Sequence, residues 1–260
     1  MRQYAERVID LHSHVLPGLD DGAPDLDAAV AMARSMAADG VRVVCGTPHV
    51  RDDYPTSAEA MEGALALMRA AVAEAGIAIE VRGGGEIALD RLPALDTGTR
   101  ARFGLGGNPA LLLLEAPYSI WLLDLPRTCA QLRRDGIVPV LAHPERNPYV
   151  QEEPTILEDV VRAGAVVQLT AASVDGRLGR PAASCARRLL ELELAHCIAS
   201  DAHGPSVREA GLSGAVAALG GGELGSWLAL AVPAALLVGE ELPPRPAGGR
   251  RRGLVERLRR

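Results

Sequence analysis

The amino-acid sequence predicts a protein of the parallel α/β class. The chain has 260 residues, enough for one large α/β barrel domain or for two small domains. Hydrophobic residues make up 48% of the sequence and charged residues 23%, a balance typical of an ordered protein with an aliphatic core. Short β-like runs alternate with helix-length amphipathic runs along most of the chain, as in parallel β/α folds.

Seven aliphatic runs are short enough for buried strands and are expected at residues 7–11, 41–46, 77–82, 111–114, 138–142, 166–169 and 197–199. Between and after them, amphipathic runs predict helices at 25–38, 57–75, 124–134, 156–163, 182–192 and 207–218. Several of these helices are followed by a glycine, which commonly ends a helix: Gly40, Gly76, Gly136 and Gly164. No shift in composition marks a second domain. Residues 1–242 are therefore expected to form one domain, and the Pro/Gly/Arg-rich residues 243–260 a tail.

Charge is distributed unevenly along the chain. The last sixteen residues carry seven arginines and one glutamate, whereas the preceding 244 residues carry a net charge of −12. An acidic body argues against a nucleic-acid-binding groove. The basic tail is expected to be solvated, and weak attraction to an acidic partner or to an anionic membrane surface is the alternative.

The cysteines and the apolar residues indicate a cytoplasmic protein. The four cysteines form no C-x-x-C pair and no disulfide-framework spacing, so reduced and buried thiols are expected. The N-terminus lacks the apolar stretch of a signal peptide. The longest apolar run, residues 227–238, has 12 residues and contains Pro233, far short of the roughly 20 residues that span a bilayer.

Acidic and imidazole side chains follow the ends of six expected strands. The first strand leads into Asp10-Leu11-His12-Ser13-His14, where two-residue alternation places Asp10, His12 and His14 on one face. The ends of later strands carry the remaining candidates, which are His49, Glu86, Glu115, His143, Glu145, Arg146, Asp201 and His203. In a β/α barrel these strand ends converge at the face where the active site is built.

Taken singly, these residues predict little, because one His after a strand is usually an ordinary loop residue and Glu115 alone could cap a helix or form an ion pair. Their joint occurrence at one rim is more informative, since unpaired buried charge is costly and cations would balance it. Nitrogen and oxygen ligands without thiolates favour Mn²⁺, Fe²⁺ or Zn²⁺. The candidates are too numerous for one ion, so we expect two or three ions, an arrangement suited to phosphoryl chemistry.

Two arginines are candidates for phosphate binding, each by a different mechanism. Arg146 follows His143 closely, and its planar guanidinium suits a phosphate group, although a surface salt bridge with Glu145 is the alternative. Arg51 completes the C-x5-R spacing of cysteine-dependent phosphatases with Cys45. That spacing arises readily by chance in an arginine-rich chain, and Pro48 removes one amide from such a loop. We therefore interpret Cys45 as an apolar strand residue.

The strand-end segments read IDLHSHVLPGLDDG, GTPH, GGGEI, LLLLEAP, PVLAHPER, VVQLTAAS and IASDAHG. In this order they resemble the successive motifs of the polymerase-and-histidinol-phosphatase (PHP) superfamily. More narrowly, they resemble its CpsB/CapC family of bacterial metal-dependent protein-tyrosine phosphatases, which are encoded with capsule and exopolysaccharide loci. The resemblance covers about residues 8–212, and HSHxLPGxDDG, HPER and SDAH are its specific motifs. It implies a distorted TIM-like (β/α)7 barrel that holds three metal ions, commonly manganese.

By motif position, the resemblance implies a role for each candidate residue. His12, His14, Glu86 and Asp201 would hold the first metal, and Glu86 would bridge to a second metal completed by Glu115 and His143. The third metal would be held by Asp21, His49 and His203. Arg146 matches a phosphate-contacting arginine of the family, and Arg208, five residues after His203, is carried over as the second.

The same resemblance implies a function. Family members dephosphorylate the tyrosine-rich tail of a cognate bacterial tyrosine kinase that controls polysaccharide polymerisation and export. Metal-bound hydroxide would attack phosphorus in line, and the tyrosyl oxygen, whose phenol has a pKa of about 10, would leave. Asp201, His203 or a metal-bound water would serve as the general acid. The alternatives are a small-molecule phosphatase such as one acting on histidinol phosphate, the cysteine mechanism through Cys45 and Arg51, and a metal-stabilised scaffold without activity.

Overall fold

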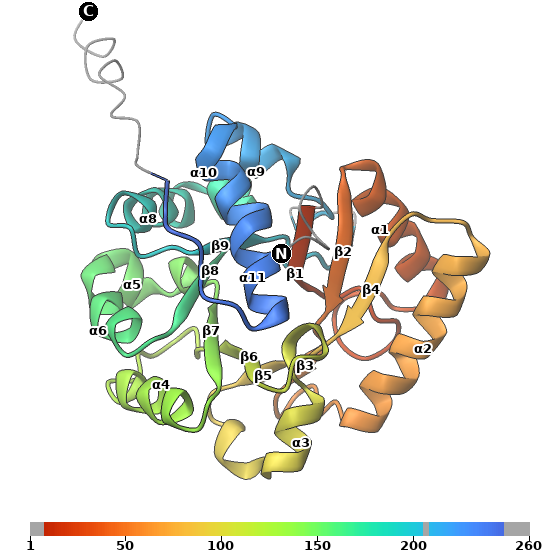
Figure 1. Ribbon diagram of the computed structural model, residues 1–260, viewed down its shortest axis with the longest axis horizontal. Helices are drawn as coiled ribbons and strands as arrows, with labels where there is room; N and C mark the ends of the chain where they lie inside the picture. The colour runs from red at the N-terminus through yellow and green to blue at the C-terminus, as the bar shows by residue number, and fades with distance from the viewer. Residues whose placement is uncertain (1–7, 205–207, 247–260) are drawn as a thin grey trace, which may run out of the picture.

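The computed structural model describes residues 8–204 and 208–246, and its parallel strands form a central ring surrounded by helices (Figure 1). The strands form two parallel sheets of order β1-β2-β4 and β3-β5-β6-β7-β8-β9. Their bounds are β1 Val8–Ser13, β2 Val41–Gly46, β3 His49–Val50, β4 Glu80–Gly83, β5 Glu86–Ala88, β6 Leu111–Glu115, β7 Val138–Ala142, β8 Val166–Thr170 and β9 Cys197–Ala199. The α/β class is therefore confirmed.

Two of the strands are interrupted, which explains the division into two sheets. Thr47 and Pro48 separate β2 from β3, and two glycines separate β4 from β5. With each interrupted strand counted once, the described strands occupy seven positions, as a (β/α)7 arrangement requires. The ring closes between β1 and the residues after β9, where the amide of His14 donates to the carbonyl of Ala202 (2.9 Å) and the amide of Asp201 donates to the carbonyl of His12 (2.8 Å).

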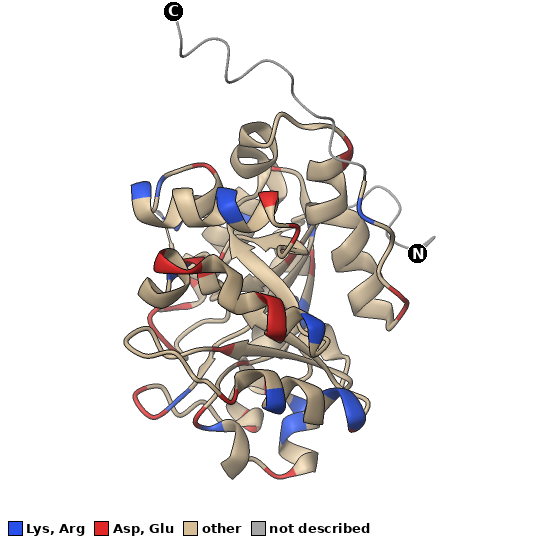
Figure 2. Ribbon diagram, turned by 90° about the vertical axis from the view of Figure 1, so that its left-hand side faces the viewer, with Lys and Arg blue, Asp and Glu red and all other residues tan. Residues whose placement is uncertain are grey.

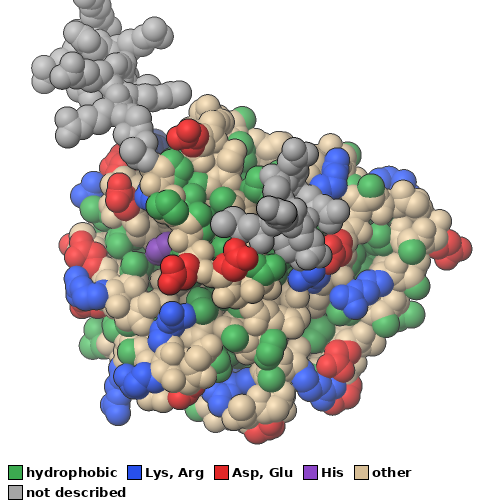
Figure 3. Space-filling model, in the orientation of Figure 1, with side chains coloured by type: hydrophobic (Ala, Val, Ile, Leu, Met, Phe, Trp, Pro, Cys, Tyr) green, Lys and Arg blue, Asp and Glu red, His purple; other side chains and the backbone are tan. Residues whose placement is uncertain are grey.

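Helices cover the outside of this ring (Figure 1). Local caps fix where the first two begin, because Asp25 accepts from the amide of Ala28 and Ser57 from that of Ala60. The α-helices are α1 Leu26–Ala38, α2 Ala58–Glu74, α3 Thr97–Arg102, α4 Leu125–Arg134, α5 Pro148–Glu152, α6 Leu157–Arg162, α7 Ala171–Val174, α8 Arg180–Glu191, α9 Ser213–Ala218, α10 Gly222–Ser226 and α11 Val232–Val238. Acidic residues and arginines are interspersed over these outer helices (Figure 2). The face shown in Figure 3 also carries charges of both signs.

Two expected elements begin later in the structure, and several short elements were not expected. The strand expected at 77–82 begins at Glu80, because Gly76 and Ile77 still close the end of α2 through the bond from the Ile77 amide to the carbonyl of Val72. The short strands β3 and β5 and the short helix α3 were not predicted. The helix expected at 207–218 begins only at Ser213. The Asp39 carboxylate accepts from the amides of Leu212 (2.6 Å) and Ser213 (2.9 Å) and so holds the turn before it.

The C-terminal apolar run closes the end of the ring opposite the carboxyl ends of the strands. It forms a π-helical turn, Trp227–Ala231, followed by α11, which lies across the strands in Figure 1. The Asn108 side chain, just before β6, donates to the carbonyl of Leu236 in α11 (3.3 Å). No helix in the described part of the chain is long and apolar enough to cross a membrane.

The first residues of the expected tail pack on the body. Arg245 donates to the carbonyls of Ala195 (2.7 Å) and Leu190 (2.9 Å), and its guanidinium lies 5.2 Å from the centroid of the Trp227 ring. Residues 247–260, which contain the rest of the expected tail, lie outside the described residues.

Candidate metal centre

The structure brings all nine expected metal ligands together at the carboxyl ends of the strands. They fall into four overlapping groups, and in each group one ligand atom per residue lies within 4.8 Å of the others. The groups are His14, Asp21, His49 and His203; His12, Glu86 and His143; His12, His14 and Asp201; and His49, Glu86 and Glu115. Four residues, His12, His14, His49 and Glu86, thus belong to two groups each, whereas by motif position only Glu86 was expected to be shared.

Glu86 lies at the centre of the cluster and is fully buried. Its Oε1 is 2.8 Å from Nε2 of His143 and 3.4 Å from Nε2 of His12, and its Oε2 is 2.7 Å from Nδ1 of His49. Burial raises the pKa of this carboxyl, but the surrounding imidazoles outweigh burial and hold the pKa well below its usual range. Glu86 therefore contacts three imidazoles of the cluster through its two carboxylate oxygens.

Contacts through Nδ1 orient three of the imidazoles. Nδ1 of His12 lies 3.0 Å from Oε1 of Gln168, and Nδ1 of His14 lies 2.6 Å from Oδ2 of Asp20. Nδ1 of His203 lies 2.8 Å from the carbonyl of Asp201. These contacts leave the Nε2 atoms to face the cluster, as second partners do for metal-binding histidines.

Asp20 was missed by the sequence reasoning, which selected only its neighbour Asp21. Besides His14, it accepts from the amide of His49 (2.9 Å) and from that of Gly22 (3.0 Å). Burial raises the pKa of Asp20, but the His14 ring and these amides lower it to about 2. The adjacent aspartates in LPGLDDG were the only signal for it, and nothing in that signal says which carboxylate points inward.

The residues fit divalent cations on two observations. Oε1 of Glu115 and Oδ1 of Asp201 are buried and make no hydrogen bond, which is costly unless a cation is near them. Burial lowers the pKa of His14, but the surrounding carboxylates raise it well above its usual range, so this environment favours positive charge. Burial and repulsion by Glu86 raise the pKa of Glu115 to about 7. The donor set of imidazoles and carboxylates without thiolates suits Mn²⁺, Fe²⁺ or Zn²⁺.

Two arginines face the other side of Asp201. Nη1 of Arg146 lies 2.6 Å and Nη1 of Arg208 3.2 Å from Oδ2 of Asp201. The Arg146 guanidinium also lies 5.0 Å from the centroid of the Tyr118 ring, which stacks on His143 at 5.8 Å. The alternative pairing of Arg146 with Glu145 is wrong, because Glu145 is buried and accepts from the amide of Thr170 (2.8 Å).

Backbone strain is concentrated at this site. Among the described non-glycine residues, only His143 (φ 33°), Asp201 (φ 50°) and Glu193 (φ 60°) have positive φ. Such conformations cost roughly 1–3 kcal/mol each and persist where the surroundings enforce them. Two of the three are candidate ligands, so the fold holds these side chains in place against local preference.

The structure contradicts the cysteine mechanism. Cys45 is fully buried in β2, and burial raises the pKa of its thiol far above its usual range, which disfavours a nucleophilic thiolate. Arg51 lies beyond the strand interruption and pairs with Glu115 (3.3 Å) and Asp53 (2.8 Å). Cys45 is therefore an apolar strand residue, and Arg51 contacts the metal cluster instead.

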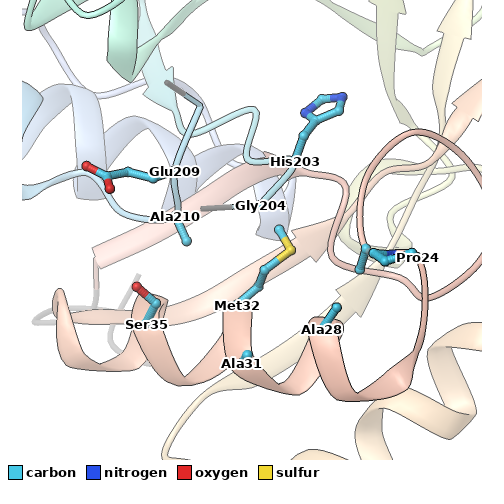
Figure 4. Close-up of a pocket in the computed structure, with 10 residues that line it drawn as sticks. Pro24, Ala28, Ala31, Met32, Ser35, His203, Gly204, Glu209 and Ala210 are labelled. Carbon is cyan, nitrogen blue, oxygen red and sulfur yellow. The ribbon is translucent and has the colours of Figure 1, made fainter. Parts of the chain in front are cut away.

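A cavity of about 380 Å³ lies between α1 and the segment that follows β9. Its walls are mostly apolar, including Ala28 and Met32 of α1 and Ala210. Figure 4 shows the His203 ring pointing away from Met32, and Nε2 of His203 lies 3.3 Å from Oδ1 of Asp21 in the cluster. Among the described residues that line the cavity, His203 is the one that belongs to the metal cluster, and the other cluster residues do not line it.

Comparisons with known proteins agree with this geometry. Residues 8–221 match the family described as capsular polysaccharide synthesis, CpsB/CapC. The tyrosine-protein phosphatase YwqE of Bacillus subtilis is 34% identical over 77% of this chain and 79% of its own length. The putative tyrosine-protein phosphatase CapC of Staphylococcus aureus is 27% identical over 75% of this chain and 77% of its own length.

The fold agrees as well. A crystal structure from a study of YwqE from Bacillus subtilis and CpsB from Streptococcus pneumoniae, described as unique metal-dependent tyrosine phosphatases, covers 92% of this chain and 99% of its own. The TM-score is 0.82 at 30% sequence identity. With the family match spanning most of the described residues, the chain belongs to the CpsB/CapC family of capsular polysaccharide synthesis proteins.

Proposed function

We propose that this protein is a metal-dependent phosphatase that hydrolyses phosphotyrosine in proteins. The observation that carries the proposal is the cluster of nine imidazoles and carboxylates beside two arginines that share Asp201. The imidazoles and carboxylates that could bind metal ions and the two arginines that could bind phosphate thus lie together at the carboxyl ends of the strands, where the active sites of such barrels lie. The relatives named tyrosine-protein phosphatases support the same activity.

The proposed ligands are the nine residues of the cluster: His12, His14, Asp21, His49, Glu86, Glu115, His143, Asp201 and His203. We propose two or three ions, with Mn²⁺ preferred and Fe²⁺ or Zn²⁺ as alternatives. When bound, the ions would supply a water of lowered pKa as nucleophile and positive charge for the phosphate oxygens. Glu86 would keep neighbouring ions together, because its two oxygens face different imidazoles.

Arg146 and Arg208 would bind the phosphate group of the substrate. Both guanidiniums now rest on Oδ2 of Asp201, so a phosphate could replace that carboxylate as their partner once Asp201 faces a cation. Arg146 is only 18% exposed and lies against Tyr118, which limits its motion. The leaving tyrosyl oxygen needs a proton. The neighbouring imidazoles hold Asp201 ionised, and burial together with His14 lowers the pKa of His203 to about 3, so neither side chain is in its acid form near neutral pH. We therefore propose that a water on one of the ions would be the donor.

We further propose that the substrate is the tail of a cognate bacterial tyrosine kinase that controls capsular polysaccharide synthesis, and that the enzyme works in the cytoplasm. The family description and the names of the relatives support the link to capsule synthesis. All four cysteines are free and buried, as expected in a reducing compartment. The basic residues 243–260 remain a proposed tail for weak contact with an acidic partner or an anionic membrane.

The proposal is tested by rates on a phosphotyrosine peptide and on histidinol phosphate, with the metal content of the same preparation measured. We expect kcat/KM to be higher for the peptide, activity to disappear in EDTA, and Mn²⁺ to restore it best. A higher kcat/KM for histidinol phosphate would instead assign a small-molecule phosphatase. Full activity in metal-free protein would refute the metal centre.

A further inference from the structure

We propose that an apolar groove beside the metal centre binds the segment of the substrate protein that flanks the phosphotyrosine. The groove lies between residues 117–123 and α5 and has a volume of about 520 Å³. Its lining includes the apolar or aromatic residues Ile120, Trp121, Leu123 and Tyr149 and the acidic residues Glu152 and Glu153. This inference rests on the proposed phosphotyrosine phosphatase activity and specifies the kind of sequence that the enzyme prefers.

Most of the large exposed hydrophobic side chains among the described residues lie in the two segments that form the groove. Of the six large hydrophobic side chains that are exposed there, Tyr118, Ile120, Leu123 and Tyr149 lie in this loop or in α5. Leu123 is 90% exposed, although leucine is usually buried. Soluble proteins rarely gather apolar side chains on the surface in this way unless the surface binds something.

One buried side chain connects the groove to the metal centre. Asn147 directly follows Arg146, and its side-chain Nδ2 donates to the carbonyls of Pro117 (2.9 Å) and Ile120 (3.1 Å). Its side-chain oxygen accepts from the amide of Tyr149 (2.9 Å) and so begins α5. Both walls of the groove are therefore fixed to the residue next to Arg146, one of the two proposed phosphate-binding arginines.

Tyr118 lies in the loop that forms one wall of the groove, and its ring also contacts the residues where the phosphate would bind. Its ring lies against Arg146 and stacks on His143, and it is two residues from Ile120. An extended peptide advances about 3.3 Å per residue, so side chains two or three residues from a phosphotyrosine lie roughly 7–10 Å away. In this proposal, a substrate whose phosphate contacts Arg146 places such side chains over the groove, because the loop wall and α5 both meet the residue next to Arg146.

The charge around the groove specifies the occupant further. The proposed phosphate-binding site is cationic because of Arg146 and Arg208, whereas the groove itself is lined by Glu152 and Glu153, which are both exposed. The negative charge of Glu152 and Glu153 then favours a basic residue in the substrate, farther from the phosphotyrosine than the apolar residues. The expected recognition sequence is a phosphotyrosine with apolar side chains two or three residues away, followed by an arginine or lysine.

The test uses the full chain loaded with Mn²⁺ and three substrates. The first is a phosphotyrosine peptide with leucine two and three residues from the phosphotyrosine on both sides and arginine beyond. The second is the same peptide with serine in place of the leucines, and the third is p-nitrophenyl phosphate, which is too small to reach the groove. The groove variant is Ile120→Gln/Leu123→Gln, and the matched control is Leu67→Gln in α2, where the leucine is 60% exposed.

We expect the parent protein to prefer the leucine peptide. The groove variant should raise KM for that peptide about tenfold, the effect of losing one good apolar contact, and change the other two substrates by less than about twofold. The Leu67→Gln control should match the parent on all three substrates. Replacing the terminal arginines of the leucine peptide by glutamate should also raise its KM.

Equal KM values for the leucine and serine peptides in the parent would overturn the docking proposal and leave the phosphatase activity standing. An equal loss on p-nitrophenyl phosphate would also overturn it, because the variant would then have damaged the site. If sedimentation shows that the groove variant dissociates a dimer while KM for the leucine peptide is unchanged, the groove binds a second copy instead. A parent protein inactive on all three substrates would refute the proposed function itself.

Discussion

The carboxylate of Asp201 faces two different sets of side chains. Its Oδ1 lies 3.4 Å from Nε2 of His12 and 3.3 Å from Nε2 of His14, and its Oδ2 accepts from Arg146 and Arg208. Burial raises the pKa of Asp201, but the neighbouring imidazoles hold it well below its usual range, so the group stays ionised. One buried side chain thus connects the metal cluster to the arginines proposed to bind phosphate.

The first prediction concerns Arg146. Replacing it by alanine should lower kcat/KM on a phosphotyrosine peptide by an amount equivalent to about 2–4 kcal/mol, because a largely buried charge-assisted contact to phosphate is lost. Arg146→Lys should recover only part of the rate, since a lysine cannot reproduce the planar guanidinium. Steady-state kinetics with metal content measured would check both variants. If both folded variants match the parent, Arg146 does not contact the substrate.

At this scale the sequence identified residues that have distinctive chemistry at strand ends. Histidines and acids at those positions were predicted as ligands because a buried imidazole or carboxylate needs a reason to be there. Asp20, Gln168 and Tyr118 could not be selected in the same way. Their roles depend on which neighbouring side chain each one contacts, and that is decided by loop conformation rather than by residue type or spacing.

Among the elements, the short strands β3 and β5 were not predicted from the sequence, although His49 and Glu86, which begin them, were predicted as ligands. Pro48 and the two glycines before Glu86 lie just after the predicted strands 41–46 and 77–82, and His49 and Glu86 then begin the short strands β3 and β5. The two residues pair directly in register between these strands. Hydrophobic patterning located the main strand segments, but a two- or three-residue strand has too few side chains to show a pattern.

The second prediction concerns the junction between β8 and β9. His196 accepts from the amide of Val167 through Nδ1 (3.1 Å), and burial together with Arg245 lowers its pKa to about 4. The unfolded chain therefore binds a proton at higher pH than the folded protein does, so this group removes stability as the pH falls below about 6.5 and towards 4. Between pH 8 and pH 5 the loss is about 2 kcal/mol.

The variant His196→Asn tests this effect, because asparagine offers an acceptor without a titrating ring. Denaturant unfolding gives the free energy of unfolding of the parent and of the variant at pH 8 and at pH 5. The value for the variant minus the value for the parent should be about 2 kcal/mol larger at pH 5 than at pH 8. Metal binding affects both proteins alike and cancels in the comparison. A difference that stays constant with pH would show that His196 titrates normally in the folded state.

Seen as a whole molecule, the protein has two ends with different tasks. The carboxyl ends of the strands carry the metal cluster, and the opposite end is closed by α11, which packs near the start of β6. The sequence predicted the parallel α/β alternation and the rim of ligands, because both depend on patterns that are local or repeat from strand to strand. It did not predict how the C-terminal apolar run closes the ring, since that packing depends on contacts between distant parts of the chain.

The third prediction concerns stability of the whole fold. The cluster buries several carboxylates against one another, so cations should stabilise the folded state. At a free metal concentration of one hundred times Kd, one site contributes about 2.7 kcal/mol, which corresponds to a Tm increase of roughly 5–10 °C for a chain of this size. Calorimetry of EDTA-treated protein before and after Mn²⁺ addition would measure it. An unchanged Tm would argue against metal binding at the cluster.

The most direct test of the central claim compares Glu86→Gln with Cys45→Ser on one phosphotyrosine peptide, with metal content and circular dichroism recorded for both. Glu86→Gln removes the charge at the centre of the cluster, so activity should fall at least ~100-fold and metal occupancy should drop. Cys45→Ser exchanges a buried strand side chain and should leave turnover near that of the parent. An inactive but folded and metal-loaded Cys45→Ser protein, together with an active Glu86→Gln protein, would contradict the metal-centre account.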